Sequence, residues 1–307
     1  MTAATIGQIK QQTQQWLNDS ENSHLPSFWF TDWLLFVIKQ PSSFLITDEN
    51  YQLTDIELTQ FHAGVTKMQQ GTPLACLTGK QEFWSLNFKV NEHTLIPRPD
   101  TEVLIEQVLA WINAQPNRND DDNKPKRLLD LGTGSGCIAI SLAHELKQNR
   151  LNGQSAQTAQ TESWQVVAVD LSLEALKVAR HNAMVNEVTD IKFIQSSWYE
   201  VLSAQDEPLF DVIVSNPPYI DEEDEHLARL VAEPISALSA PNHGFADIAH
   251  IVKQAPQHLR KGGLLAIEHG FDQGAKVRQL FLDNRFESVH TVQDFGGNDR
   301  VTLGQLL

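Results

Sequence analysis

The sequence predicts an α/β protein in which a small helical domain precedes a Rossmann-like domain with a seven-stranded sheet. Short apolar runs recur at 127–131, 164–170, 191–194 and 210–215, and segments with a helical pattern follow the first three of them. Buried parallel strands have this continuous apolar character, and their alternation with helices predicts a parallel sheet. Residues 1–75 show helical periodicity alone.

The remaining elements follow in order along the chain. Residues 1–75 are expected to be the helical domain, 76–100 a hairpin linker with arms at 82–90 and 94–96, and 101–307 the sheet domain. Apolar side chains at helical spacing usually pack together, so the core of the helical domain is predicted to contain Trp29, Trp33, Leu34, Val37 and Ile38. The sheet domain is completed by helices at 246–259 and 275–284 and by strands at 263–268, 288–292 and 300–303. Polar loops are expected at 115–126 and 152–163.

The first apolar run leads into a glycine-rich turn made of Gly132, Thr133, Gly134, Ser135 and Gly136, which opens an apolar helix. Glycines let the backbone pass close to a ligand, and a helix N-terminus attracts negative charge, so this turn is typical of a nucleotide-type site. A dinucleotide-binding fingerprint needs another glycine or alanine three residues after the second, where this chain has a cysteine. A Walker loop would end in Gly-Lys-Ser or Gly-Lys-Thr, which is absent from the turn.

Two further strand ends carry candidate ligand-binding residues. Asp170 ends the second apolar run, a position from which a carboxylate can bind both hydroxyls of a ribose. The alternative role for Asp170 is to cap the helix at 174–186, but Ser172 is better placed for that. Trp198 follows the third run and is expected to flank an adenine ring, with burial in the core as its alternative. Ligands of open α/β sheets bind at the carboxyl ends of the strands, where these residues would meet.

The fourth apolar run ends in the sequence Asn216-Pro217-Pro218-Tyr219. The Asn216 side-chain oxygen and the Pro217 carbonyl can each accept one N–H of a substrate –NH₂ group, and Tyr219 can stack on its plane. The two prolines restrict the backbone and so preorganise these acceptors. An –NH₂ group conjugated with a carbonyl or a ring must be held in this way before its lone pair can react, so the motif predicts methyl transfer to a planar nitrogen. An ordinary turn after a strand is the alternative, because Asn-Pro is common in loops.

Together, the glycine turn, the strand-ending aspartate and Asn-Pro-Pro-Tyr resemble a class I S-adenosylmethionine-dependent methyltransferase. Further segments are similar to those of the HemK/PrmC family of protein-glutamine N5-methyltransferases, at 73–79, 82–84, 95–102 and 233–234. The resemblance runs from about residue 72 to the end of the chain. It implies methyl transfer from S-adenosylmethionine, leaving S-adenosylhomocysteine, to the glutamine amide nitrogen in the Gly-Gly-Gln motif of bacterial class I peptide chain release factors.

The resemblance also implies roles for individual residues. The turn at 132–136, Asp170, Trp198 and Asn216 would contact the cofactor. Asn216, Pro217, Pro218 and Tyr219 would hold the glutamine side chain, and of these Asn216, Pro217 and Tyr219 would be the catalytic residues. The helical domain would help to recognise the release factor. Three residues depart from the family pattern in this sequence, namely Ser197, Cys76 and Ala232.

The expected reaction is an in-line displacement in which the glutamine amide nitrogen attacks the sulfonium methyl group. Because the methyl donor is already activated, the protein would contribute mainly orientation, which can supply ~7–11 kcal/mol in well-aligned systems. Asn216 and Pro217 would also stabilise the positive charge that develops on nitrogen. The proton can leave after methylation, so neither Asp100 nor Glu102 is assigned as a general base.

The composition agrees with a soluble, cytoplasmic enzyme. Of the 307 residues 41% are hydrophobic, and the longest uninterrupted apolar stretch, at 33–38, is far too short to cross a bilayer. No signal peptide is expected, because the N-terminus lacks a basic region followed by an apolar one. The two cysteines, Cys76 and Cys137, suggest a reducing compartment. No metal is expected either, because no group of His, Cys and Asp residues has the spacing of metal ligands.

The net charge of −16 argues against a nucleic-acid substrate, because nucleic-acid binders need a cationic surface. Asn-Pro-Pro-Tyr also serves DNA adenine methyltransferases, but here the carboxylates of 221–225 follow it and would repel a phosphate backbone. We expect this acidic run to steer a basic protein partner. Two alternatives stay open: glutamine methylation of a ribosomal protein, and N-methylation of a nucleic-acid base. A non-enzymatic scaffold would need a damaged turn or motif, and neither is damaged.

Overall fold

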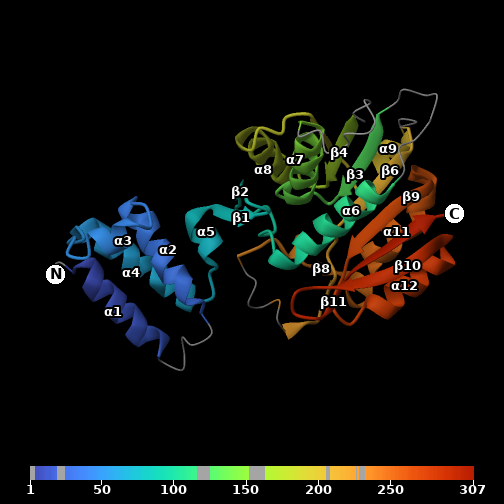
Figure 1. Cartoon of the computed structure of the whole chain (residues 1–307). Helices are drawn as coiled ribbons and strands as arrows, with labels where there is room; N and C mark the ends of the chain where they lie inside the picture. The colour runs from blue at the N-terminus through green and yellow to red at the C-terminus, as the bar shows by residue number, and fades with distance from the viewer. Residues whose placement is uncertain are drawn as a thin grey trace. The chain divides into compact units, whose positions relative to one another are not determined.

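The computed structural model describes residues 4–18, 25–115, 125–151, 163–204, 208–225, 227 and 232–307. The chain divides into two compact units, one formed by residues 1–79 and the other by residues 80–228 and 233–307. Figure 1 shows the elements of both units. The loops expected at 115–126 and 152–163 lie almost entirely outside the described residues.

The described part of the first unit is helical. Its elements are α1 (Ile6–Leu17), α2 (Ser27–Ile38), α3 (Phe44–Thr47), α4 (Asp55–Gln69) and α5 (Leu74–Thr78). Thr5 and Thr54 begin α1 and α4 with capping boxes, in which the threonine oxygen accepts a backbone N–H and a glutamine or glutamate three residues later accepts the threonine N–H. These exchanges satisfy N–H groups that a helix start otherwise leaves without partners.

The core of the first unit confirms the sequence prediction. Trp33, Leu34, Val37 and Ile38 are all buried, and Trp29 packs half-buried at the edge of the same cluster. Helices α2 and α4 lie close together. The Trp33 indole N–H on α2 donates to the Phe61 carbonyl on α4 at 3.0 Å. Gly64 makes room for the indole ring, since a Cβ there would lie 2.1 Å from it.

The second unit is built on a seven-stranded sheet in the order β10-β11-β9-β6-β3-β4-β5, which confirms the predicted fold class. Its strands are β3 (Lys126–Leu131), β4 (Trp164–Asp170), β5 (Ile191–Gln195), β6 (Phe210–Ser215), β9 (Leu259–Glu268), β10 (Phe286–Gln293) and β11 (Asp299–Leu306). All neighbours pair in parallel except β11, which is antiparallel to both β9 and β10. The strand order reverses between β3 and β6, and ligands of open α/β sheets bind at such a switch point.

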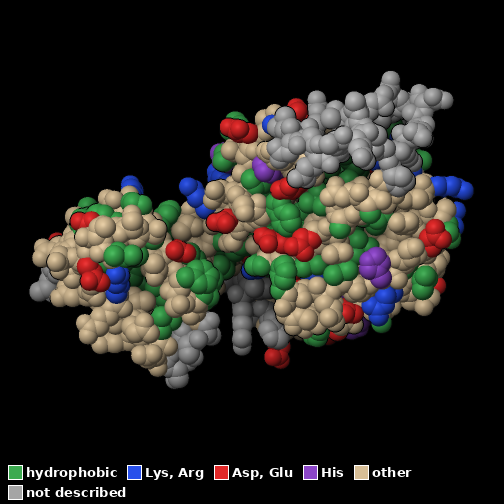
Figure 2. All heavy atoms as spheres, in the orientation of Figure 1, with side chains coloured by type: hydrophobic (Ala, Val, Ile, Leu, Met, Phe, Trp, Pro, Cys, Tyr) green, Lys and Arg blue, Asp and Glu red, His purple; other side chains and the backbone are tan. Residues whose placement is uncertain are grey.

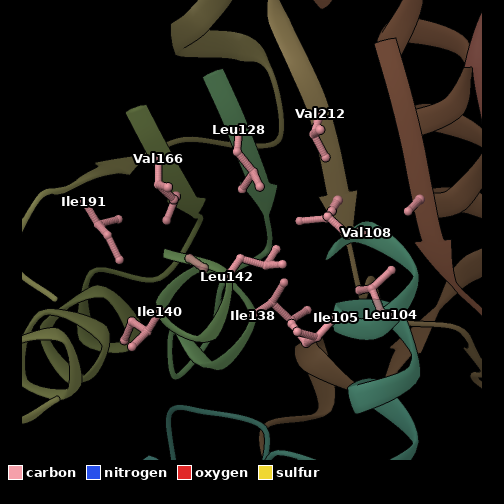
Figure 3. Packing of buried hydrophobic residues seen from close by; sticks show 14 of the residues in the cluster. Leu104, Ile105, Val108, Leu128, Ile138, Ile140, Leu142, Val166, Ile191 and Val212 are labelled. Carbon is pink, nitrogen blue, oxygen red and sulfur yellow. The ribbon is translucent and has the colours of Figure 1, made fainter. Parts of the chain in front are cut away.

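Alternate residues along the strands supply two hydrophobic cores on opposite faces of the sheet. Leu128 and Val212 face α6 and α7, whereas their neighbours Leu129 and Ile213 face α11 and α12. Figure 3 shows side chains of α6 and α7, such as Val108 and Leu142, near the strand residues on the first face. The flanking helices are α6 (Glu102–Ala114), α7 (Cys137–Leu151), α8 (Leu173–Val185), α9 (Glu200–Ala204), α11 (Ala246–His258) and α12 (Gly274–Asp283). This burial on both faces explains why the parallel strands are continuously apolar.

The hairpin differs in part from its prediction. Strands β1 (Lys80–Phe83) and β2 (Leu86–Lys89) pair directly across a two-residue turn, in which Trp84 and Ser85 have φ of 52° and 57°. The expected arm at 94–96 is wrong, because these residues belong to no strand. Pro97 and Pro99 follow at once, and proline lacks the N–H that a strand ladder needs.

Short elements follow the Asn-Pro-Pro-Tyr motif or precede α6. They are η1 (Pro99–Thr101), β7 (Ile220–Asp221), η3 (Ile235–Ala237), β8 (Ser239–Ala240) and α10 (Pro241–Gly244), and β7 pairs in parallel with β8.

On the face of the second unit that Figure 2 shows, the described basic side chains form no continuous patch. Within the described ranges, no helix has the length and apolar character needed to span a membrane.

Candidate active site

The predicted site residues meet at the carboxyl ends of the parallel strands. A cavity of about 290 Å³ lies there in the second unit. Its walls include most of the residues that the sequence predicted, namely Gly132, Thr133, Gly134, Ser135, Asp170, Trp198, Asn216 and Pro218. Gly136, Pro217 and Tyr219 do not line this cavity. The switch point of the sheet therefore brings together residues from four strand ends.

The glycine turn crosses from β3 to the end of β4. The backbone N–H groups of Gly132 and Thr133 both donate to the Val169 carbonyl, at 3.0 and 2.9 Å. Gly132, Gly134 and Gly136 have φ of 72°, 54° and 84°, values that side-chain-bearing residues rarely adopt. At Gly134 a Cβ would meet nothing within 4 Å, so open space adjoins the turn there.

Gly136 serves the packing of the turn rather than the cavity. A Cβ on Gly136 would lie 2.7 Å from Cδ1 of Ile140 and 3.1 Å from Cβ of Ala179. Because Ala179 belongs to α8, the absent side chain allows α7 to begin close to that helix. Gly136 therefore has a structural role in helix packing, and its predicted contact with the cofactor stays a prediction.

Asp130 anchors the same turn from within the core. Its side chain is fully buried, and its Oδ2 accepts a hydrogen bond of 2.6 Å from the Thr133 hydroxyl. Burial raises the pKa of Asp130 to about 7. Its Oδ1 atom has no hydrogen-bond partner among the residues that the structure describes. Sequence reasoning assigned no role to Asp130. The available signal was a carboxylate one residue before the end of an apolar strand.

Asp170 is held by backbone groups on both sides of its carboxylate. Oδ2 accepts the Gly134 N–H and Oδ1 accepts the Ser172 N–H, each at 2.8 Å. Burial raises its pKa, and these two hydrogen bonds oppose the rise. Ser172 is the N-cap of α8, since its hydroxyl accepts the Ala175 N–H at 3.2 Å, which confirms the choice between the two residues. The orientation of the Asp170 carboxylate at the cavity wall is thus fixed by the glycine turn and by the residue that caps α8.

Trp198 lies against the glycine turn. Its ring atom Cζ3 is 3.3 Å from where a Cβ of Gly132 would be, and its backbone has a φ of 48°. The Trp198 side chain also donates a hydrogen bond to Asp247, a residue of the first turn of α11 that lines the cavity. Sequence reasoning missed Asp247, because nothing local to an amphipathic helix marks one of its acidic residues as a cavity residue.

Asn216 and Tyr219 connect to two buried residues that sequence reasoning also missed. The Asn216 Nδ2 donates to the Thr101 hydroxyl at 3.2 Å, and the Tyr219 hydroxyl donates to Oε1 of Glu268 at 3.3 Å. Thr101 and Glu268 are each 1% exposed. Burial raises the pKa of Glu268 to about 7, although hydrogen bonds from Thr101 and Tyr219 and the charge of Arg300 act to lower it.

The position of Tyr219 bears on its predicted role. Its ring packs half-buried against the hydrophobic core shared with α11 and α12, and burial raises the pKa of its hydroxyl. Stacking of Tyr219 on a substrate stays a prediction.

Glu233 ties two cavity-lining segments together. Its Oε2 accepts the Ile96 N–H at 2.8 Å, and its Oε1 forms an ion pair with Arg98. The Glu233 side chain is buried, while Arg98 and Pro234 both line the cavity. The segments at 95–102 and 233–234, which the sequence singled out separately, therefore meet through this carboxylate.

Comparison with known proteins establishes the family. Residues 122–296 match the family described as a methyltransferase domain. A release factor glutamine methyltransferase of Aliivibrio fischeri is 41% identical over 274 residues, covering 89% of this chain and 87% of that protein. The protein of the same name from Escherichia coli K12 is 42% identical over 265 residues, 86% of each chain. This chain belongs to the release factor glutamine methyltransferase family.

The fold of this family member also matches a solved structure. The T. thermophilus 16S rRNA N2 G1207 methyltransferase, solved with AdoMet and guanosine, has a TM-score of 0.50 and 17% identity, covering 74% of this chain and 50% of that one. At this identity the likeness concerns the fold alone.

Ser197 is one of the three residues that depart from the family pattern. Ser197 lines the cavity, and so does Asp247, which is hydrogen-bonded to the adjacent Trp198. No group of three or more His, Cys, Asp and Glu residues that could hold a metal occurs within the described ranges.

Proposed function

We propose that this enzyme transfers a methyl group from S-adenosylmethionine to the side-chain amide nitrogen (N5) of the glutamine in the Gly-Gly-Gln motif of bacterial class I release factors. Loss of the methyl group converts the cofactor to S-adenosylhomocysteine. One observation carries the proposal: Asn216 lies on the cavity wall with its –NH₂ directed to Thr101. Its side-chain oxygen is then left to accept an N–H of a substrate amide. The names of the similar enzymes support the choice of substrate.

The residues of the cavity fit the cofactor. The positive φ angles of the glycine turn and the open space beside Gly134 leave room for a ligand close to the backbone. Asp170 would bind the ribose hydroxyls with its remaining lone pairs, since its carboxylate plane is already fixed by two backbone donors. Trp198 would flank the adenine. S-adenosylmethionine supplies an activated methyl group that needs no further activation by the protein.

The protein contributes orientation and charge stabilisation. The glutamine nitrogen forms a bond to the methyl carbon as the carbon–sulfur bond breaks, and one amide proton is then released to water. The Asn216 oxygen and the Pro217 carbonyl accept the two N–H groups and stabilise positive charge on the nitrogen as it develops. A well-aligned geometry of this kind can contribute ~7–11 kcal/mol.

The substrate is a protein rather than a nucleic acid. The net charge of −16 and the acidic run at 221–225 beside the motif disfavour a phosphate backbone. We assign recognition of the release factor in part to the helical domain predicted at residues 1–75, and place the reaction in the cytoplasm, where translation ends. Methylation of a ribosomal protein glutamine is the second candidate, since the same amide chemistry would serve it.

The test is transfer of labelled methyl from S-adenosylmethionine to three substrates in parallel. They are an intact bacterial release factor, the same factor with the glutamine of its Gly-Gly-Gln motif replaced by alanine, and duplex DNA. Label on the intact factor alone is the expected result. Label on DNA, or equal label on both forms of the factor, would overturn the proposal.

A further inference from the structure

We propose that Thr101 and Glu268 act as positioning residues that set the direction of the Asn216 side-chain amide. They hold its oxygen, rather than its –NH₂, toward the bound glutamine. This inference rests on the proposed function and adds two residues to its machinery. Neither of them needs to touch the substrate's reacting nitrogen.

The two ends of an asparagine side chain have nearly the same shape but opposite hydrogen-bonding character. The oxygen only accepts hydrogen bonds, whereas the –NH₂ only donates them. A substrate –NH₂ also only donates, so a rotation of the Asn216 amide by half a turn would set donor against donor. Two N–H groups of the substrate would then lose partners at the moment when charge develops there. Some feature of the fold must therefore distinguish the two ends.

Thr101 is the hydrogen-bond partner of this amide, and it lines the same cavity. Its Oγ1 lies 3.2 Å from the Asn216 Nδ2 and accepts a hydrogen bond from it. Thr101 is 1% exposed and ends the short helix η1 just before α6. A threonine hydroxyl can either donate or accept, however, so Thr101 alone would tolerate both orientations of the amide.

Glu268 removes this ambiguity. It lies 1% exposed at the end of β9 and receives hydrogen bonds from the hydroxyls of Thr101 and Tyr219. An ionised carboxylate only accepts, so the proton of Thr101 is directed to Glu268. Only the oxygen lone pairs of Thr101 then remain for Asn216, which must present its –NH₂ to them. In its ionised form Glu268 thus directs the hydrogen bond of the Thr101 hydroxyl and, through Thr101, that of the Asn216 amide.

Charged groups around Glu268 maintain this arrangement. Arg300 favours the carboxylate, while Asp100 opposes it. Arg300 is held in turn by Asp294, to which its Nη2 and Nε donate at 2.9 and 3.1 Å. Its Nη2 also lies 3.7 Å from Asp100. The cation therefore balances two carboxylates beside the buried chain, and it stabilises the form of Glu268 that directs Asn216.

The experiment compares methyl transfer to the release factor by the full-length enzyme and four variants. Thr101→Val keeps the shape of the side chain but removes its hydroxyl, and Thr101→Ser restores the hydroxyl. Glu268→Gln replaces a pure acceptor with a group that also donates. Thr302→Val is the matched control, because Thr302 is buried on β11 and its hydroxyl bonds His269 and Thr291. Each variant is measured for kcat, for KM and Kd of S-adenosylmethionine, and for Tm.

We expect Thr101→Val and Glu268→Gln to lower kcat about tenfold, the effect of losing one directing hydrogen bond. KM and Kd for S-adenosylmethionine should not change, and Thr101→Ser should recover most of kcat. Thr302→Val should leave kcat unchanged.

Several outcomes would overturn the inference. Equal kcat for the valine and serine variants would do so, and so would a parallel loss of cofactor affinity, which would assign Thr101 to the shape of the cofactor site. A loss of kcat in Thr302→Val as large as in Thr101→Val would also count against it. An inactive wild-type enzyme would instead overturn the proposed function itself.

Discussion

Gly244→Ala is expected to damage the active site from outside it. Gly244 ends α10 with a φ of 71°, and a Cβ there would lie 1.9 Å from the Tyr219 carbonyl oxygen. The obstructing atom belongs to the backbone of the Asn-Pro-Pro-Tyr motif, so no flexible side chain can move aside. Gln273 also holds this carbonyl, with its Nε2 at 3.1 Å. The motif and α10 would have to separate.

The magnitude follows from two terms. A side chain in the left-handed region costs roughly 1–2 kcal/mol, and overpacking adds about 1–3 kcal/mol, so Gly244→Ala should destabilise by about 2–5 kcal/mol. Gly262→Ala isolates the first term, because Gly262 has a φ of 72° and a Cβ there would meet nothing within 4 Å. The displaced motif should also lower kcat by about 10²-fold, as a misplacement of ~1 Å can do.

The assay pairs thermal unfolding with methyl transfer to the release factor for both variants. Gly244→Ala should show the larger fall in Tm and the selective loss of kcat, with cofactor Kd nearly unchanged because the glycine turn follows a different strand. Gly262→Ala should lose only the roughly 1–2 kcal/mol of the first term and no activity. Identical Tm and kcat in the two variants would refute the reasoning, because the clash with Tyr219 would then have no consequence.

Four further predictions concern the site itself. Asn216→Ala should lower kcat by roughly 10²–10³-fold while cofactor Kd stays near its normal value, and a variant with near-normal kcat would remove Asn216 from catalysis. Asp170→Ala should raise the Kd for S-adenosylmethionine about tenfold or more by calorimetry, since hydrogen bonds to a charged group are worth ~1.5–3 kcal/mol. Because burial raises the pKa of Glu268 to about 7, its carboxylate is lost as pH falls through that value, and kcat should fall with it. A pH profile unchanged in Glu268→Gln would contradict this origin. Replacing Glu222, Glu223 and Glu225 with glutamine should lower kcat/KM at low salt but not kcat, whereas an unchanged salt dependence would argue against steering by the acidic run.

The strands of the second unit were predictable because each buried parallel strand is a continuous apolar run. The runs at 127–131 and 164–170 lie within or match β3 and β4, and the closing strands at 288–292 and 300–303 lie within β10 and β11. The arm at 94–96 was wrong for a local reason that the sequence also contained. The two prolines that follow it lack the N–H group that a strand ladder needs, and Thr94, Leu95 and Pro97 line the cavity instead.

The candidate site was predictable to the extent that its residues follow strands directly. Parallel strands bring their carboxyl ends to one edge, so the glycine turn, Asp170 and Asn216 had to lie near each other once the sheet was assumed. Gly136, Pro217 and Tyr219 belong to the same motifs but do not line the cavity, because the direction of the backbone within a turn decides which residues face it.

The sequence by itself determined the fold class, the chemistry of the site and the edge of the sheet where that chemistry lies. These depend on local periodicity and on motifs of a few adjacent residues. Only the tertiary structure decided how Asn216 is oriented, because its partner Thr101 lies 115 residues away and Ile96 meets Glu233 across 137 residues. No periodicity spans such separations. Which buried polar group meets which is settled when the sheet closes, since a polar group without a hydrogen bond costs free energy in a core without water.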